Sequence, residues 1–165
     1  MVRAGGRRPR DEGSATLEFI ALTLLLLVPL LYLVVAVGRV QAGTFAAQAS
    51  ARDAARGAVV EGVAAVEDGK SAADARAAAE RFARAANDVA LADFGLGPST
   101  STIALACTAD PCFAPGSEVT AHVAVSVPLP GMPAFLRGAV PLAVTVTADA
   151  GSPVDGLAAD AGTGP

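Results

Sequence analysis

The sequence has few of the side chains that usually fill a large hydrophobic core. Its 165 residues include 6 Phe, 1 Tyr and no Trp, so only 4% are aromatic although 53% are hydrophobic. Much of the apolar fraction is alanine, which buries little area per residue, so any core must be thin. The length suits one membrane element and one small outer domain rather than two full domains.

The chain also lacks the residue patterns of several functional classes. It has no glycine-rich phosphate loop and no block of basic residues interleaved with aromatics, the usual footprint of nucleic-acid binding. A zinc site needs four ligands, and His122 is the only histidine. No nucleophile, base and orienting group can be assembled around it. We therefore expect a protein that is not an enzyme, carries no cofactor or metal, and binds neither nucleic acid nor a small-molecule substrate.

One long apolar run stands near the N-terminus. Phe19 to Gly38 is 20 residues without a charge, dense in Leu and Val. Twenty helical residues rise about 30 Å, the thickness of the hydrocarbon core of a bilayer, so the run predicts a transmembrane helix over 19–38. The alternatives are a secretory signal peptide, whose apolar region is shorter at roughly 7–15 residues, and a buried helix of a soluble domain. The rest of the chain is too small to bury such a helix.

The arginines around this run predict its orientation. Four of them precede the span, at Arg3, Arg7, Arg8 and Arg10, and only Arg39 follows it directly. By the positive-inside rule the N-terminus is cytoplasmic and the residues from about 40 onward are extracytoplasmic. We therefore expect a single-pass membrane protein.

The chain stays helical in character beyond the span. Small residues recur there at spacings of three or four, at Ala47, Ala51, Ala54 and Ala58. Such a stripe permits close helix approach, but alanine is also simply a good helix former, and the sequence leaves both interpretations open. Nothing breaks the helix before about Val60, so we expect one long helix over residues 14–60.

A second helix and a sheet are predicted for the remainder. Ser71 and Asp74 form a capping-box-like helix start, and Gly95 to Pro98 ends the helix. The apolar face of this helix is predicted at Ala75, Ala78, Phe82, Ala86 and Val89. Glu80 and Arg84 form an i,i+4 pair on the opposite side.

Apolar and polar residues then alternate over 102–107, 118–127 and 140–147, which indicates a small three-stranded antiparallel sheet that covers the helices. Pro141 predicts that the third strand starts late or lies at an edge. The fold class is therefore α+β: a transmembrane helix extended into a long helix, a second amphipathic helix and a small sheet. The outer domain is predicted over 61–150, and the Gly- and Ala-rich tail 151–165 is expected to be disordered.

The two cysteines, Cys107 and Cys112, lie between the first two strands. An even pair in an extracytoplasmic loop indicates a disulfide, which would hold the hairpin together. His122 falls on the polar side of the second strand, where a solvated side chain is expected.

Gly13, Glu18 and the run that begins at Phe19 together resemble the type IV prepilin motif, in which a glycine, four residues and a glutamate precede a long apolar helix. The string "GSATLEFIALTLLLLVPLL" and the later segment "ARDAAR" (51–56) look like the start of the TadE-like family of the Flp, or Tad, pilus system. The likeness covers Gly13 to about Arg56, a quarter of the chain.

This resemblance implies a minor pilin or pseudopilin, a pilin-like component of pilus assembly. A membrane-bound prepilin peptidase would cut between Gly13 and Ser14, so that residues 1–13 form a cytoplasmic leader and Ser14 becomes the new N-terminus. The implied partners are this peptidase, other pilin-like subunits and the inner-membrane platform of the pilus. The mature chain would stay in the bacterial cell membrane as a single-pass protein or enter a cell-surface pilus.

Glu18 is the predicted assembly carboxylate. A charge at membrane depth is expensive and normally serves a function, and the ammonium group of a neighbouring subunit is a suitable partner. The alternative is that Glu18 only favours a helix N-terminus, an effect of about 0.3–1 kcal/mol.

Two further functions stay open at this point. The chain can be a signal-anchored membrane protein that binds an envelope partner and has no pilus role. It can also be a secreted protein released by signal peptidase.

Overall fold

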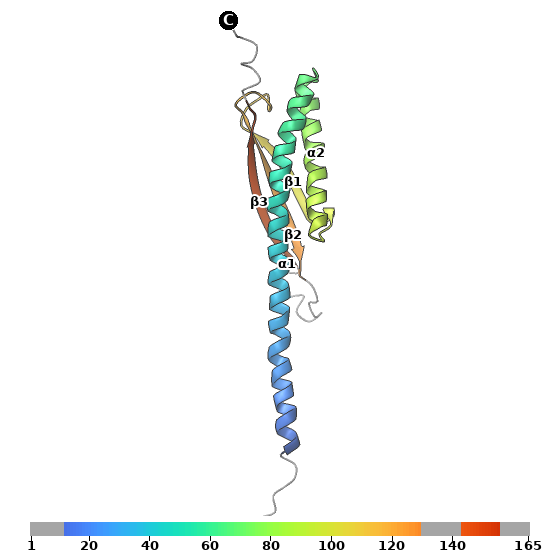
Figure 1. The fold of residues 1–165 in the computed structure, drawn as a ribbon, viewed down its shortest axis with the longest axis vertical. Coiled ribbons are helices and arrows are strands. Elements are labelled where there is room, and N and C mark those ends of the chain that lie inside the picture. The colour runs from blue at the N-terminus through green and yellow to red at the C-terminus, as the bar shows by residue number, and fades with distance from the viewer. Residues whose placement is uncertain (1–11, 130–142, 156–165) are drawn as a thin grey trace, which may run out of the picture. The chain divides into compact units, whose positions relative to one another are not determined.

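The computed structural model describes residues 12–129 and 143–155 (Figure 1). The chain divides into two compact units, Met1–Gly38 and Arg39–Pro165, and each is described by itself. One helix, α1 (Glu12–Glu67), contributes to both. The unbroken helix predicted over 14–60 is confirmed, and it extends beyond both predicted ends. The predicted leader falls mostly on residues 1–11, which lie outside the described residues.

The described part of the first unit is the N-terminal portion of α1. It continues through Pro29, whose missing N–H leaves the carbonyl of Leu25 without its usual helical donor. Nearly all of its side chains from Ala15 to Gly38 are exposed. The Thr23 hydroxyl donates to the carbonyl of Phe19 at 2.8 Å, so this polar group is satisfied within the helix itself.

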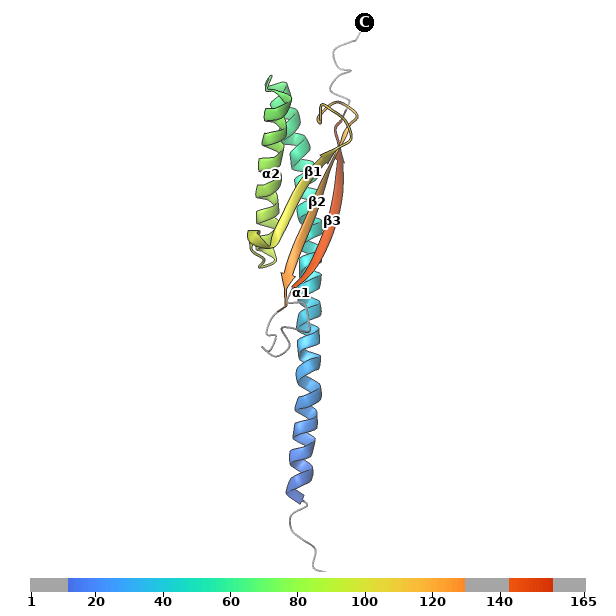
Figure 2. The ribbon, with the colours of Figure 1, turned by 180° about the vertical axis from the view of Figure 1, so that it is seen from behind.

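The second unit combines the rest of α1 with one more long helix and a sheet. The further elements are α2 (Ala72–Asp93), the short 3-10 helix η1 (Pro98–Thr100), β1 (Ser101–Cys107), β2 (Glu118–Pro128) and β3 (Ala143–Pro153). The sheet is antiparallel with the order β1-β2-β3, and the register pairs Ile103 with Val123 and Val123 with Ala148. One face of the sheet covers the helices, and α2 lies alongside β1 (Figures 1 and 2). The predicted α+β fold is confirmed.

The second unit is held together by a face of α1 that carries almost only alanine. Six of these alanines are at most 1% exposed: Ala46, Ala47, Ala51, Ala54, Ala55 and Ala58. The first three pack with the buried valines of β2, namely Val123, Val125 and Val127. The small-residue stripe predicted from the sequence is therefore a buried packing face.

Glycines extend this close packing at three positions of α1. Val127 of β2 lies over Gly43, the ring of Phe82 of α2 lies over Gly57, and the ring of Phe113 lies over Gly62. A Cβ atom at any of these glycines would collide with the side chain above it. The glycines thus let bulky residues rest directly on the helix backbone.

The N-terminus of α2 is capped as predicted, with one difference in detail. The Ser71 hydroxyl accepts a hydrogen bond from the backbone N–H of Asp74 at 3.1 Å. It also donates to the Asp74 carboxylate at 2.6 Å, so this side chain bonds the Ser71 hydroxyl rather than the Ser71 backbone.

The predicted apolar face of α2 is wrong in part. The structure buries Ala75, Ala79, Ala83, Asn87, Ala90 and Leu91, whereas Phe82 and Val89 are 40% and 64% exposed. The helix turns its smallest side chains inward because they permit close approach to α1 and the sheet. Hydrophobicity alone favoured the larger residues, which lie on the neighbouring face.

The predicted third strand and tail also need correction. β3, described from Ala143, continues to Pro153 rather than ending near residue 147. Val154 is only 4% exposed, and its N–H donates to the carbonyl of Ser117 at 2.8 Å. The ordered domain therefore extends past residue 150, and the expected tail 151–165 was placed too early. Residues 140–142 and 156–165 lie outside the described part.

Candidate functional site

The residues of the predicted processing site lie at the start of α1. The Gly13–Ser14 peptide bond lies near the N-terminal end of α1 as described, which is at Glu12. Glu18 follows Ser14 by four residues, which places both on one face of the helix, one turn apart.

Glu18 is exposed on α1, directly before the apolar surface. It forms no ion pair within the described part of the chain. The residues after it expose large apolar side chains on every side of the helix, with Leu25 and Leu26 at 72% and 73%. Removing apolar surface from water is favourable by roughly 25 cal/mol per Å². This part of the helix therefore needs a lipid or protein environment.

The structure contains a candidate membrane span at this place. Among the described residues, α1 is the one helix long and apolar enough to cross a bilayer, with a mean hydropathy of 2.9 over its most apolar window. None of the described residues buries that window. The span lies near the N-terminus, where the sequence predicted it.

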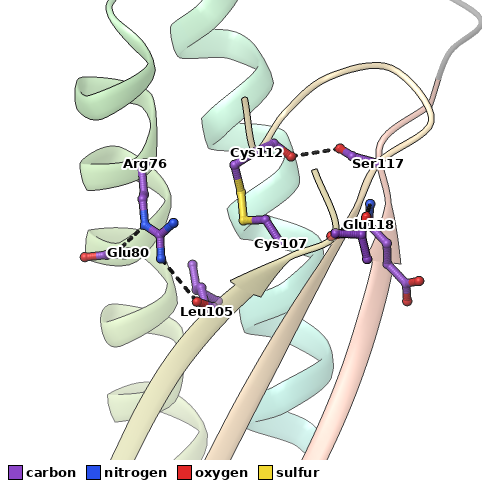
Figure 3. Close-up of a disulfide and its surroundings, with 8 residues drawn as sticks. Arg76, Glu80, Leu105, Cys107, Cys112, Ser117 and Glu118 are labelled. Atoms are coloured by element: carbon purple, nitrogen blue, oxygen red, sulfur yellow. Dashed lines mark hydrogen bonds and ion pairs between the residues drawn. A yellow bond between two sulfur atoms is a disulfide. The ribbon is translucent and has the colours of Figure 1, made fainter. Parts of the chain in front are cut away.

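Cys107 and Cys112 are joined by a disulfide, as the sequence predicted (Figure 3). The bond closes a short loop at the end of β1. Around it, the Ser117 hydroxyl donates to the carbonyl of Cys112 at 2.8 Å, and the N–H of Glu118 donates to the Thr108 hydroxyl at 2.8 Å. The β1–β2 connection is thus fixed by one covalent bond and by side-chain hydrogen bonds.

Arg76 ties α2 to β1 (Figure 3). Its guanidinium donates to the Glu80 carboxylate at 3.2 Å and to the carbonyl of Leu105 at 3.4 Å. Glu80 also faces Arg84 at 3.8 Å, the i,i+4 pair expected from the sequence. Arg76 therefore satisfies a backbone carbonyl of β1, which is an edge strand. Unpaired carbonyls on an edge strand can otherwise form hydrogen bonds with a strand of another chain.

His122 lies on the exposed face of the sheet, in agreement with its predicted position. The antiparallel register sets it opposite Asp149, and its Nδ1 lies 2.7 Å from a carboxylate oxygen of that residue. Both side chains are more than half exposed, so the pair adds little to stability. In the described ranges no group of three or more His, Cys, Asp or Glu side chains is placed to hold a metal ion.

Sequence reasoning missed a buried series of side-chain hydrogen bonds that joins three elements. Ser50 of α1 donates to the Asn87 side-chain carbonyl at 2.8 Å, and the Asn87 amide nitrogen donates to the Ser101 hydroxyl at 2.8 Å. Ser50 and Asn87 are 0% and 3% exposed. The available signal was the position of Asn87, four residues after Ala83, on what is otherwise an alanine face.

Comparisons with known proteins identify no relative: no protein-family model matches the chain, and no curated protein or solved structure matches it significantly. The resemblance to the TadE-like family therefore stays a prediction that rests on residues 13–56. The functional argument depends on the residues of the chain itself.

The disulfide yields the first testable prediction. Replacing both cysteines with alanine should lower the free energy of unfolding by about 2 kcal/mol, because closing a loop of about six residues removes that much chain entropy from the unfolded state. Chemical denaturation of the full chain in detergent, with and without reductant, measures this. Reductant should destabilise the wild type and leave the double variant unchanged. Equal stability of the oxidised wild type and the double variant would contradict the prediction.

Proposed function

We propose that this protein is a minor pilin or pseudopilin of the TadE-like type, which takes part in assembling a Flp/Tad pilus or a related secretion apparatus. The observation that carries the proposal is the order of features on α1. Gly13 and Glu18 stand directly before an exposed apolar surface, and the same helix continues into the alanine face that organises the outer unit.

Processing would occur near the N-terminal end of α1. A prepilin peptidase hydrolyses the bond between Gly13 and Ser14, which leaves a carboxylate on Gly13 and a free ammonium group on Ser14. The cleavage removes residues 1–13 and with them all four arginines that precede the span.

Glu18 acquires its role from this cleavage. A carboxylate next to an apolar surface loses hydration when that surface enters lipid, so it needs a positive partner. The new ammonium group of Ser14 is such a partner, and in an assembly it is supplied by the neighbouring subunit. Pairing between subunits would stabilise the insertion of each chain beside the next one. The alternative role of Glu18, an interaction with the N-terminus of its own helix, would stabilise each separate chain by about 0.3–1 kcal/mol and would not link subunits.

The proposed location is the bacterial cell membrane, with the N-terminus in the cytoplasm and the second unit outside. The disulfide between Cys107 and Cys112 supports this orientation, because such bonds persist in oxidising compartments outside the cytoplasm. The arginines before the span support it independently through the positive-inside rule. The proposed partners are the prepilin peptidase, other pilin-like subunits and the membrane platform of the apparatus.

The mature N-terminus tests this proposal. Removing residues 1–13 leaves 152 of the 165 residues, beginning at Ser14. Intact-mass measurement or N-terminal sequencing of the protein from a host with a prepilin peptidase should find this start, and Gly13→Leu should prevent the cleavage. An intact N-terminus would instead favour a signal-anchored protein without a pilus role, and a start near residue 40 would favour a secreted protein. Either result would refute the proposal.

A second prediction concerns Glu18. Glu18→Ala should still be cleaved after Gly13, but its cross-linking yield to neighbouring pilin-like subunits should drop about tenfold, the effect of losing about 1.4 kcal/mol. Glu18→Gln should behave like Glu18→Ala, since it keeps the shape and removes the charge. Glu18→Asp, which keeps the charge, should retain most of the yield. Normal assembly of the Ala and Gln variants would leave Glu18 with only its helix-terminus role.

A further inference from the structure

The two helices of the second unit form a groove that no described residue fills. It lies between the second half of α1 and α2 and has a volume of about 630 Å³. Its apolar lining includes Ala49, Gly57 and Val60 of α1 and Phe82, Ala86 and Val89 of α2. The absence of a side chain at Gly57 brings the Phe82 ring down onto α1. The groove therefore has an apolar floor formed by both helices.

The α2 side of the groove carries an exposed apolar stripe. Its members are spaced by three and then four residues: Phe82, Ala85 and Val89. This is the spacing of the a and d positions in a coiled coil, where side chains interlock with those of another helix. The stripe shares Phe82 and Val89 with the face that the sequence predicted as apolar, and the described part of the chain leaves both side chains exposed. Val60 of α1, 61% exposed, adds to the same open surface.

Charged residues border the groove with an acidic excess. Asp53 and Glu61 on α1 and Asp93 on α2 line it, with Arg56 as the single base. None of these four residues forms an ion pair within the described part of the chain. The border therefore presents free carboxylates on both helices.

These features select one kind of occupant. From Ala49 to Glu61, α1 rises about 18 Å, which suits about three turns of a docked helix. An apolar stripe at heptad spacing would fill the floor, and Lys or Arg beside that stripe would meet the carboxylates. A second copy of this chain would present the same acidic border and bring like charges together. An anionic lipid surface would be repelled for the same reason.

We propose that the α1–α2 groove is a docking site for an amphipathic helix of another protein, with apolar residues at heptad spacing and basic residues on the flanks. The site lies in the second unit and does not depend on cleavage after Gly13 or on Glu18. It would give the protein a partner that is recognised outside the membrane-spanning helix.

The test uses the full chain in nonionic detergent and a fluorescent synthetic helix of about four turns. The helix has Leu at the a and d positions and Lys at the e and g positions, and a second helix replaces each Lys with Glu. Fluorescence anisotropy, corrected with empty micelles, should show at least about tenfold tighter binding of the Lys helix. The difference should shrink at high salt, because exposed charge pairs are screened.

Two protein variants locate the binding. Val89→Glu places a charge in the apolar stripe and should weaken binding of the Lys helix at least about tenfold, since the valine surface can no longer be buried. Val66→Glu is the matched control, because Val66 is also exposed, at 47%, and lies on α1 outside the groove. It should change binding by less than about twofold. Both positions are exposed, so neither variant should unfold the protein.

Four results would overturn the proposal. Equal affinity for the Lys and Glu helices would contradict it, and so would the absence of binding by both helices. Equal weakening by Val89→Glu and Val66→Glu would show that binding occurs elsewhere. A Val89→Cys variant that rapidly forms disulfide-linked dimers in dilute solution would assign the groove to a second copy of this chain, whereas the proposal expects it to stay monomeric.

Discussion

The second unit depends on the close approach of α1 to its neighbours. This approach is possible because the inward face of α1 carries alanine and glycine, so that Val127, Phe82 and Phe113 rest on the helix backbone at three successive points. The chain has few aromatic side chains with which to span a wider gap. The short distance between α1 and its neighbours makes large side chains unnecessary. Dispersion contacts with the helix backbone contribute the packing energy that bulkier core residues would otherwise supply.

The same helix changes character along its length. From Phe19 to Gly38 it exposes Leu and Val on all sides, whereas beyond Arg39 it buries one alanine face and exposes charged residues such as Arg52 and Asp53. The first pattern suits lipid and the second suits a small protein domain in water. The hydrogen bonds from Ser50 through Asn87 to Ser101 fix the position of α2 in the thin core. A rotation or slip of α2 would leave these polar groups without partners.

Much of this fold follows from local patterns in the sequence. The uncharged run, the Ser71 cap, the alternation of the strands and the spacing of the cysteines each reflect an interaction within a few residues, and each was predicted. The buried face of α2 was not, because its choice of Ala79 and Ala83 over Phe82 depends on the distance to α1. The continuation of β3 to Pro153 depends on pairing with Glu118 and its neighbours, far away in the sequence.

The candidate sites divide in the same way. Gly13, Ser14 and Glu18 were found from a linear motif, and the cysteine pair from its spacing. The α1–α2 groove was not predicted, since it arises only when α2 turns Phe82 and Val89 away from the core. A hydrophobic pattern shows that a face is apolar, but only the packing of the helices shows whether the chain itself covers that face.

Replacing alanine with leucine at two positions of α1 probes the close-approach requirement. Ala51 is fully buried against the sheet, whereas Ala64 is exposed on the same helix. If close packing holds the second unit together, Ala51→Leu should lower its free energy of unfolding by about 1–3 kcal/mol or more, while Ala64→Leu should change it by less than about 0.5 kcal/mol. Equal stability of the two variants in denaturant titrations would contradict the dependence of this fold on the small side chains of α1.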